Sequence, residues 1–422
     1  MSVDTWPQDQ GLDADLLRAA REAFADQGRI KVAVAVSGGG DSIALLHLMH
    51  RAAAQTGYQI YAVTVDHGLR AEAAAEAAGV AQFCANLGIP HATLHWRDHP
   101  TTGNVMDHAR HARTRLIGDW ARLQGIAQIA LGHTADDVAE TFLMGLARAA
   151  GLDGLAGMRG RWQTACLTWS RPLLRHSRAS LRAYLSRHAI AWVDDPTNED
   201  EDYTRVKARK VLAALAPLGI TVDRLTISIA HLAVAQTAVQ HGVLAAVDAY
   251  VTTPAGVVQI SRAGFNDLPP DLQRRLLVAA IAWLSGDAYP PRSAKQTTLL
   301  AAMRAGRDTT LNGCRFRSKS DHIAVTREPR AVAAITCLTD HLWDNHWRVT
   351  GPHAPDLTLR ALGAEGLRLC KNWRNCGISR DALLVSPGVW RGDALISAPI
   401  AGFNPEWSAT IPTGFAKFIL SH

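Results

Sequence analysis

Short apolar runs rich in β-branched residues alternate with amphipathic segments along the N-terminal third of the chain. The apolar runs occupy residues 31–36, 60–65, 91–96 and 126–131. Between them, apolar side chains at helical spacing predict helices over residues 42–54, 71–87 and 105–124. Starts about 30 residues apart are typical of repeated βαβ units. The pattern therefore predicts an α/β fold whose N-terminal domain has a parallel, Rossmann-like sheet, covered by helices on both faces.

Polar and glycine-rich loops follow three of the predicted strands. These loops lie at residues 37–42, 66–68 and 132–133. Ligands of parallel sheets bind beyond the carboxyl ends of the strands, and those ends meet at one edge of the sheet. We therefore expect the three loops to converge on one site.

Downstream of this sheet the pattern changes to longer helical segments, followed by a strand-like tail. Helices are predicted over residues 206–216, 223–250, 270–285 and 293–305. From residue 330 the runs shorten, and five of the twelve Trp residues lie there, either as core packing or as stacking platforms for bases. We predict three domains: residues 1–215, a helical domain at 216–328, and a small β-rich domain at 329–422.

Composition narrows the class of protein. A chain of 422 residues with 48% hydrophobic content is long enough for two or three domains with sizeable cores. No apolar run reaches the about 18–20 residues that cross a bilayer, and residues 1–7 lack the features of a signal peptide. The six cysteines include no C-x-x-C pair, which disfavours zinc and cysteine-held cluster sites. We expect a cytoplasmic protein.

Positive charge is concentrated in two stretches of the chain, although the formal net charge is only +6. Residues 154–193 contain no Asp or Glu but hold seven arginines, namely Arg159, Arg161, Arg171, Arg175, Arg178, Arg182 and Arg187. A second stretch holds Arg292, Lys295, Arg304, Arg307, Arg315, Arg317 and Lys319. Such clusters suit a polyanion such as RNA. Solvated helix faces are the alternative on charge alone.

The loop Ser37-Gly38-Gly39-Gly40-Asp41-Ser42 has the composition of a phosphate site. Its glycines allow a tight turn, and the helix behind it supplies free N–H groups and the positive end of its dipole. Asp41 would repel a bare phosphate, so it suggests a bridging Mg²⁺. The loop is neither a Walker loop nor a dinucleotide fingerprint. It matches S-G-G-x-D-S, the loop of enzymes that split ATP into AMP and pyrophosphate.

A second group of charged residues follows the strand predicted at 126–131. Asp136, Asp137 and Glu140 stand three and four residues apart at the start of a predicted helix. Such carboxylates can hold Mg²⁺ or a cationic substrate, or they can be ordinary acids of a helix N-terminus. Upstream, Arg110 and Arg113 share one helix face and suit a phosphate or carboxylate.

Taken in order, these pieces resemble the tRNA(Ile)-lysidine synthases of the pyrophosphate-loop ATPase group. The motifs are S-G-G-G-D-S at 37–42, V-D-H-G-L-R at 65–70, A-R-x-x-R at 109–113, G-H-x-A-D-D-x-x-E-T at 132–141, G-L-x-G-L-x-G-M at 151–158, R-P-L-L at 171–174, D-D-P-T-N at 194–198 and Y-x-R at 203–205. Thr114, Val206 and residues 149–151 depart from the family pattern. The resemblance is dense over residues 30–210.

The resemblance implies an ATP-dependent ligase acting on tRNA(Ile) with a CAU anticodon. ATP would adenylate the C2 carbonyl oxygen of the wobble cytidine, and the lysine ε-amine would then displace AMP to give lysidine. ATP, Mg²⁺, L-lysine and the tRNA are the implied ligands, no membrane is involved, and a homodimer stays open. The alternatives are a tRNA thiolase of the same group, or a non-catalytic nucleotide- or RNA-binding module.

The resemblance also implies roles for individual residues. For ATP it implies Ser37, Gly38, Gly39, Gly40, Asp41, Ser42, Asp66 and His133, with Asp41 as the Mg²⁺ ligand. For lysine it implies Asp136, Asp137, Glu140, Arg113 and Arg205. For catalysis it implies Asp41, Asp137 and Arg113. For tRNA it implies Arg171, Arg175, Arg178 and Arg182, with the two C-terminal domains.

Overall fold

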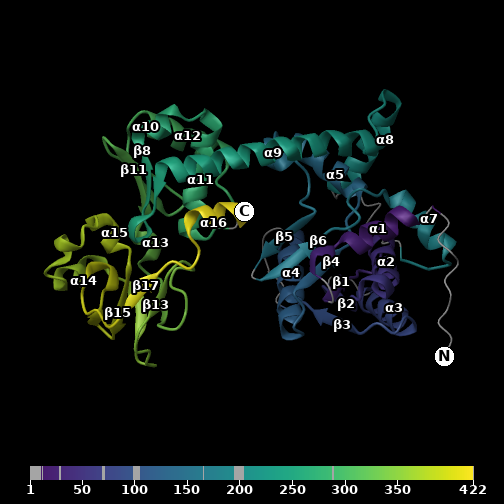
Figure 1. The fold of residues 1–422 in the computed structure, drawn as a ribbon, viewed down its shortest axis with the longest axis horizontal. Coiled ribbons are helices and arrows are strands. Elements are labelled where there is room, and N and C mark those ends of the chain that lie inside the picture. The colour runs from purple at the N-terminus through teal and green to yellow at the C-terminus, as the bar shows by residue number, and fades with distance from the viewer. Residues whose placement is uncertain are drawn as a thin grey trace. The chain divides into compact units, whose positions relative to one another are not determined.

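The computed structural model describes residues 11, 13–27, 30–68, 72–97, 105–164, 166–193, 204–287 and 289–421 (Figure 1). It consists of two compact units, Met1–Gln236 and Thr237–His422. The boundary falls inside the long helix α9 (Val222–Tyr250). The division into three domains at residues 215 and 328 stays a prediction.

A six-stranded sheet forms the centre of the first unit, in the order β3-β2-β1-β4-β6-β5. Its strands are β1 (Lys31–Ala35), β2 (Gln59–Asp66), β3 (His91–His95), β4 (Gln128–Leu131), β5 (Arg161–Thr164) and β6 (Leu167–Ser170). All neighbours pair in parallel except β5, which is antiparallel to β6. The parallel sheet expected from the sequence is confirmed, and so is the common edge for the loops after β1, β2 and β4.

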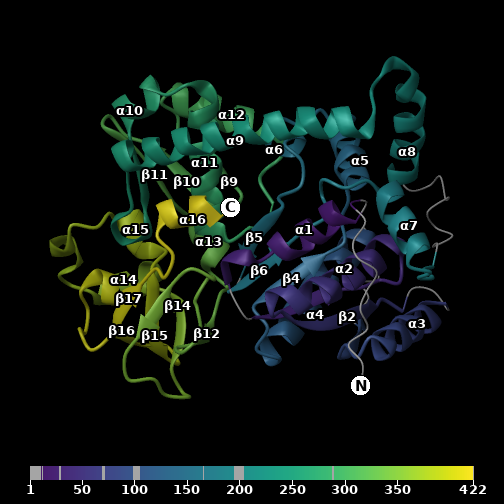
Figure 2. The ribbon, with the colours of Figure 1, turned by 45° about the vertical axis from the view of Figure 1, so that its right-hand side comes forward.

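Helices cover both faces of this sheet (Figure 2). They are α1 (Ala14–Glu22), α2 (Gly40–Thr56), α3 (Ala73–Asn86) and α7 (Arg178–Arg187) on one face and α4 (Val105–Leu123) on the other. The first unit also contains α5 (Ala135–Leu146), α6 (Leu152–Leu155) and α8 (Thr204–Leu215). Val32 and Val34 face the core shared with α1, α2, α3 and α7, whereas Ala33 faces the core shared with α4. This alternation is the period of two that a strand imposes on its side chains.

The second unit contains a five-stranded antiparallel sheet in the order β7-β8-β11-β10-β9. Its strands are β7 (Val251–Thr252), β8 (Val258–Ser261), β9 (Thr309–Leu311), β10 (Cys314–Ser318) and β11 (His322–Arg327). Its helices are α10 (Arg262–Asp267), α11 (Pro270–Ser285) and α12 (Ser293–Arg304), with the terminal α16 (Phe415–Ser421). The expected helices are confirmed. The segment 216–328, expected to be helical, therefore also contains a sheet that the sequence pattern did not predict. Two of its strands, β7 and β9, are only two and three residues long.

Residues 329–421 form a β-rich part with cores of its own. It contains α13 (Pro329–Val332), β12 (Cys337–Leu338), β13 (Arg348–Thr350), β14 (Thr358–Ala361), α14 (Gly363–Leu369), α15 (Arg380–Leu384), β15 (Pro387–Arg391), β16 (Ala394–Ser397) and β17 (Ser408–Thr410). Trp343, Trp347, Trp390 and Trp407 are buried, and Trp373 packs against the core. These tryptophans therefore serve core packing.

Among the described residues, no single helix combines the length and apolar character that a membrane span requires. One pair of helices, Thr204–Leu218 and Val222–Tyr250, meets the length and composition test together, but it is bent by 100°.

The segment after β4 passes unusually close to the loop after β1. A Cβ atom placed on Gly132 would lie 3.0 Å from the Asp41 carbonyl oxygen and 3.0 Å from the Ser42 Cα. Both of these are backbone atoms, so they cannot turn aside as a flexible side chain would. A glycine at position 132 is therefore needed to bring the two loops together.

We expect Gly132→Ala to lower the free energy of unfolding by about 1–3 kcal/mol, because the added methyl forces the two loops apart. The matched control is Gly79→Ala in α3, where an added Cβ meets nothing within 4 Å. That change should be neutral or stabilise by up to about 1 kcal/mol. Denaturant unfolding of both variants measures the difference, and equal stability would contradict the close approach.

Candidate active site

The phosphate-loop residues form a turn braced by its own serines. Gly38 has φ of +89°, a left-handed conformation that favours glycine. The Ser42 hydroxyl accepts a hydrogen bond from the Ser37 N–H (3.1 Å) and donates to the Gly39 carbonyl (2.9 Å). Gly39 is the N-cap of α2, so the first N–H groups of that helix point toward the loop. The loop has the geometry of an anion site.

A capping box sets the start of α5. Thr134 caps the helix, and the Asp137 Oδ2 atom accepts from the Thr134 N–H (2.9 Å) and the Thr134 hydroxyl (3.0 Å). Burial raises the pKa of Asp137, but the Thr134 N–H and nearby positive groups hold it below its usual value. Asp137 therefore stays ionised, and its Oδ1 atom is left for the site.

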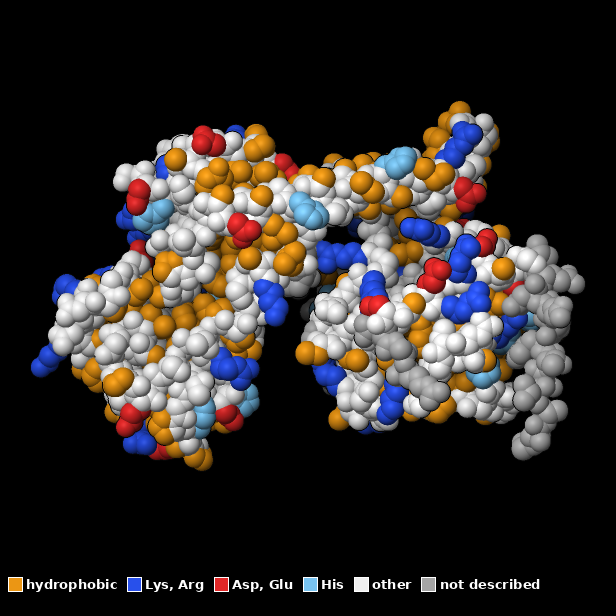
Figure 3. All heavy atoms as spheres, viewed as in Figure 1, with side chains coloured by type: hydrophobic (Ala, Val, Ile, Leu, Met, Phe, Trp, Pro, Cys, Tyr) orange, Lys and Arg blue, Asp and Glu red, His pale blue; other side chains and the backbone are white. Residues whose placement is uncertain are grey.

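Four carboxylates gather where the loops after β1 and β4 meet. Asp41 comes from the phosphate loop, and Asp136, Asp137 and Glu140 come from α5. Three guanidinium groups face them, from Arg178 at the start of α7 and from two residues of α8, Arg205 and Arg209. We call these seven residues the acid cluster. Figure 3 likewise shows basic and acidic side chains interspersed on the visible face of the first unit.

Glu140 is the most deeply buried member of the acid cluster, with no exposed surface. Its Oε1 atom accepts from Arg209 (2.7 Å) and Arg178 (3.2 Å). Its Oε2 atom is buried and has no hydrogen-bond partner among the described residues. A buried carboxylate oxygen without a donor is costly, so it marks a place for a cationic group.

A second, purely positive group lies beside the acid cluster. Burial and the nearby Arg110 and Arg205 lower the pKa of Arg113. Arg113 has no carboxylate partner among the described residues. Burial, with Arg110 and Arg113 nearby, lowers the pKa of Arg171 to about 10. Buried cations that repel one another in this way are stabilised by a bound anion such as phosphate or carboxylate.

Arg171 also orients His133. The Arg171 Nε–H donates to the His133 Nδ1 atom (3.1 Å), its Nη1 donates to the Arg159 carbonyl (2.7 Å), and the guanidinium stacks over Trp162 (4.2 Å). Because Nδ1 accepts, the proton of the neutral ring is on Nε2. Burial lowers the pKa of His133 to about 3, and Arg171 adds to this. His133 is therefore a neutral donor through Nε2–H.

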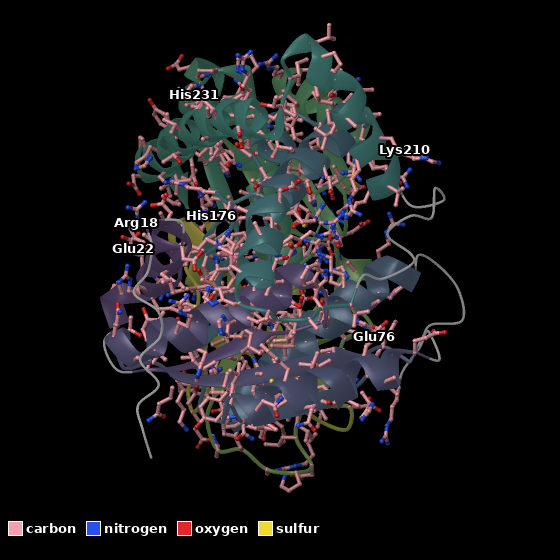
Figure 4. The ribbon with its side chains drawn as sticks, turned by 90° about the vertical axis from the view of Figure 1, so that its right-hand side faces the viewer. Arg18, Glu22, Glu76, His176, Lys210 and His231 are labelled. Carbon is pink, nitrogen blue, oxygen red and sulfur yellow. The ribbon has the colours of Figure 1, made fainter. Side chains whose placement is uncertain are left out.

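The remaining predicted residues fall around this centre. Asp66 ends β2, where its side chain accepts from the Gly68 N–H (2.9 Å). The His176 carbonyl, in the segment before α7, accepts from the N–H of Ala135 (2.9 Å) and so ties that segment to α5. His176 lies near α1, whose Arg18 and Glu22 are labelled with it in Figure 4.

The predicted tRNA residues differ in environment. Arg175 and Arg182 are exposed, whereas Arg171 and Arg178 are half-buried, beside His133 and within the acid cluster. The motif D-D-P-T-N at 194–198 and Tyr203 lie outside the described residues.

Two contacts were not predicted as part of the site. Arg209 reaches Glu140, and its position one helical turn after Arg205 is the signal that could have identified it. The Val193 N–H donates to the Gly38 carbonyl (3.1 Å) and so braces the phosphate loop. Nothing in the local sequence around Val193 indicates this contact.

In the second unit, part of the basic stretch is already paired. Arg317 contacts Asp308 and Asp381, and Arg315 contacts Asp381. Elsewhere in the unit an open, polar depression of about 440 Å³ is lined by Arg262, Asn266, Arg304, Ala305, Gly306, Ser318, Lys319 and Ser320. Arg292, Lys295 and Arg307 of the same stretch are exposed outside this depression.

Residues 12–215 match the family model of the PP-loop domain. The tRNA(Ile)-lysidine synthase of Ruegeria pomeroyi is 43% identical over 411 residues, which cover 97% of this chain and 98% of the relative. The chain belongs to the tRNA(Ile)-lysidine synthase family. The family member from Wolbachia pipientis wMel is 33% identical, covering 76% and 77% of the two chains. That from Bradyrhizobium diazoefficiens is 39% identical, covering 68% and 82%.

Membership of the lysidine synthase family decides between the alternatives left by the sequence. The chain is an ATP-using enzyme of the PP-loop type and not a thiolase. The cysteines of the first unit agree with this. Burial raises the pKa of Cys84 to about 11, and Cys166 is exposed in the β5–β6 turn, outside the acid cluster.

We expect His133 to stay neutral, as the Nε2–H tautomer, across the pH 5 to 8 window in which an ordinary histidine titrates. The neutral ring's contribution to stability is complete above pH 6.5 and is lost as the pH falls toward about 3. Nitrogen-15 NMR of the ring measures both properties. Arg171→Gln should raise the pKa of His133, whereas Arg175→Gln should leave it unchanged. A wild-type His133 that titrates near pH 6.5 would contradict the assignment.

Proposed function

We propose that the chain ligates L-lysine, through its ε-amine, to C2 of the wobble cytidine of tRNA(Ile) with the anticodon CAU. ATP adenylates the C2 carbonyl oxygen, pyrophosphate leaves, and the amine then displaces AMP to give lysidine. The observation that carries the lysine step is the acid cluster at the phosphate loop, in which the Glu140 Oε2 atom has no hydrogen-bond partner among the described residues. Its place beside Asp41 lets a cationic substrate approach the phosphate end of the site.

The phosphate loop and the arginines near Arg113 suit the anionic groups of the substrates, namely the phosphates of ATP and the carboxylate of lysine. The N–H groups at the start of α2 would hold the leaving pyrophosphate, where charge develops. Arg113 and the Nε2–H of His133 would face the adenylate phosphate or the lysine carboxylate. In these roles fixed donors stabilise charge without reorganising during the reaction.

The residues present fit a magnesium ion, although no group of three or more His, Cys, Asp or Glu side chains within the described residues forms a metal site. Mg²⁺ is usually held by one or two carboxylates together with substrate phosphates and water. Asp41 would be the protein ligand, because its carboxylate belongs to the phosphate loop and lies in the first turn of α2. When bound, the ion would stabilise the charge of the pyrophosphate.

The acid cluster suits the amine. A lysine ε-ammonium has an ordinary pKa of about 10.4 and must lose a proton before it attacks. Glu140 would hold the ammonium through Oε2, beside the guanidinium groups of Arg178 and Arg209 that already contact its Oε1 atom. A carboxylate of the cluster can then accept the proton. The base turns out of its anticodon stack to reach this point.

The direct test is incubation of the protein with radiolabelled lysine, ATP and CAU-anticodon tRNA. We expect label in the tRNA, with AMP and pyrophosphate released. The matched RNA carries U in place of the wobble C, and it should take up no label. Absence of label in both RNAs, or equal label in both, would refute the proposal.

We expect Glu140→Gln to raise the apparent KM for lysine by about 10- to 150-fold, because loss of a charge-assisted hydrogen bond costs about 1.5–3 kcal/mol. The KM for ATP should change little. The control is Glu22→Gln, an exposed carboxylate on α1 (Figure 4), which should change neither constant. An unchanged KM for lysine in Glu140→Gln would remove Glu140 from the lysine pocket.

A further inference from the structure

Arg178 has an unusual position for an arginine in a basic stretch. It is the first residue of α7, where Ser177 caps the helix by accepting from the Ser180 N–H (3.2 Å). The backbone N–H of Arg178 donates to the Asp136 Oδ2 atom (2.7 Å). The helix start is therefore fixed against α5, and the side chain of Arg178 leaves from a defined point.

The guanidinium of Arg178 directs each of its three nitrogens at a different carboxylate. Nε donates to the Asp41 Oδ2 atom (3.2 Å), Nη1 donates to the Glu140 Oε1 atom (3.2 Å), and Nη2 lies 3.6 Å from the Asp137 Oδ1 atom. The side chain is only 20% exposed. Its rigid fork thus links the phosphate loop to α5.

Among the described residues, Arg178 is the ion-pair partner shown for Asp41. Arg205 pairs with Asp137 and Arg209 pairs with Glu140, both of which are α5 carboxylates. Burial raises the pKa of Asp41, and Arg178 opposes that effect. Burial also lowers the pKa of Arg178, but Glu140, Asp41 and Asp137 raise it well above its usual value. The guanidinium therefore stays charged.

Loss of this group would change the balance of charge. Three guanidinium groups face the four carboxylates and offset most of their charge. Without Arg178, the Asp41 carboxylate would lose its counter-charge and would repel the α5 carboxylates. The phosphate loop and the ammonium site would then lose their fixed spacing, and a displacement of about 1 Å is enough to slow a transfer step strongly.

We propose that Arg178 is a positioning residue that couples the two half-reactions by holding the phosphate loop and the α5 carboxylates in one arrangement. The inference rests on the proposed function. With Arg178 in place, the adenylated cytidine forms where the lysine amine can reach its C2 atom. Arg178 acts through Asp41, Asp137 and Glu140 and does not itself touch the reacting atoms.

The consequence is a change in stoichiometry and not only in rate. When the amine is misplaced, water instead of the amine attacks C2 of the adenylated cytidine. Water then expels AMP and restores cytidine, so one ATP and one water give AMP and pyrophosphate with no lysine added. Loss of Arg178 should therefore raise the amount of AMP formed per lysine incorporated.

The sequence predicts that Arg178 contacts a tRNA phosphate, and this stays a prediction. The position of Arg178 among three carboxylates favours the positioning role instead. A tRNA phosphate would compete with three carboxylates for a half-buried guanidinium. Arg182 lies one turn further along α7 and is exposed. It is the natural comparison, because its loss removes the same charge from the same helix.

The experiment compares wild type, Arg178→Gln, Arg178→Lys and Arg182→Gln in reactions with ATP, lysine and CAU-anticodon tRNA. AMP and lysine incorporation are measured in the same tube, and tRNA binding is measured separately by filter retention. We expect the AMP-to-lysine ratio to rise several-fold in Arg178→Gln. It should rise less in Arg178→Lys, which keeps the charge but not the fork. Arg182→Gln should keep the wild-type ratio.

Each outcome distinguishes the claims. Parallel loss of AMP and lysidine in both Arg178 variants, at the wild-type ratio, would overturn the inference and assign Arg178 to folding or tRNA binding. If Arg178→Gln does not fold, Arg178→Lys alone decides by its ratio. A wild-type protein that incorporates no lysine would refute the proposed function itself, which is a different result from an unchanged ratio.

Discussion

The site depends on the pairing of β1 with β4. These strands are far apart in the chain, yet Ala35 pairs with Leu131 in the parallel sheet, while β2 flanks β1 on its other side. The strand order reverses at this point, which opens the crevice where parallel sheets bind their ligands. The phosphate loop and the start of α5 therefore leave the sheet side by side, and Gly132 lets their backbones touch.

Close packing of these two loops brings carboxylates together, and arginine side chains offset their repulsion. Four carboxylates brought to one place repel each other, and burial favours their neutral forms. The guanidinium groups of α7 and α8 supply the opposite charge, and among the described residues Arg178 pairs with carboxylates of both loops. Helices α7 and α8 therefore contribute to the site through Arg178, Arg205 and Arg209, although neither helix carries the phosphate loop. The fold places a positive group next to this acidic one, so that one site can hold both an anion and a cation.

The second unit follows a different plan. Its sheet and helices share one core, and the β-rich part has separate cores built around Trp343 and Trp390. The Trp343 ring is fully buried, and its N–H donates to the Ile335 carbonyl (3.1 Å). The tryptophans of the β-rich part are packed in these cores, and basic side chains line the surface depression of the unit.

The sequence by itself determined the features that depend on local spacing. The run at residues 31–36, the glycine loop and the α5 acids each carry their own signal, because strand period, turn geometry and helix capping act over a few residues. The elements expected there are present. The short strands β7 and β9 gave no such signal, since two or three residues show no period.

Only the tertiary structure decided which distant groups meet. Arg178 belongs to an arginine-rich stretch whose composition predicts an RNA-binding surface. In the structure, however, Arg178 contacts Asp41, which lies 137 positions earlier in the chain. Arg171 fixes the tautomer of His133 in the same way. Charge and hydrogen bonding act through space and not along the chain, so these pairings follow from strand order and from the point at which α7 begins.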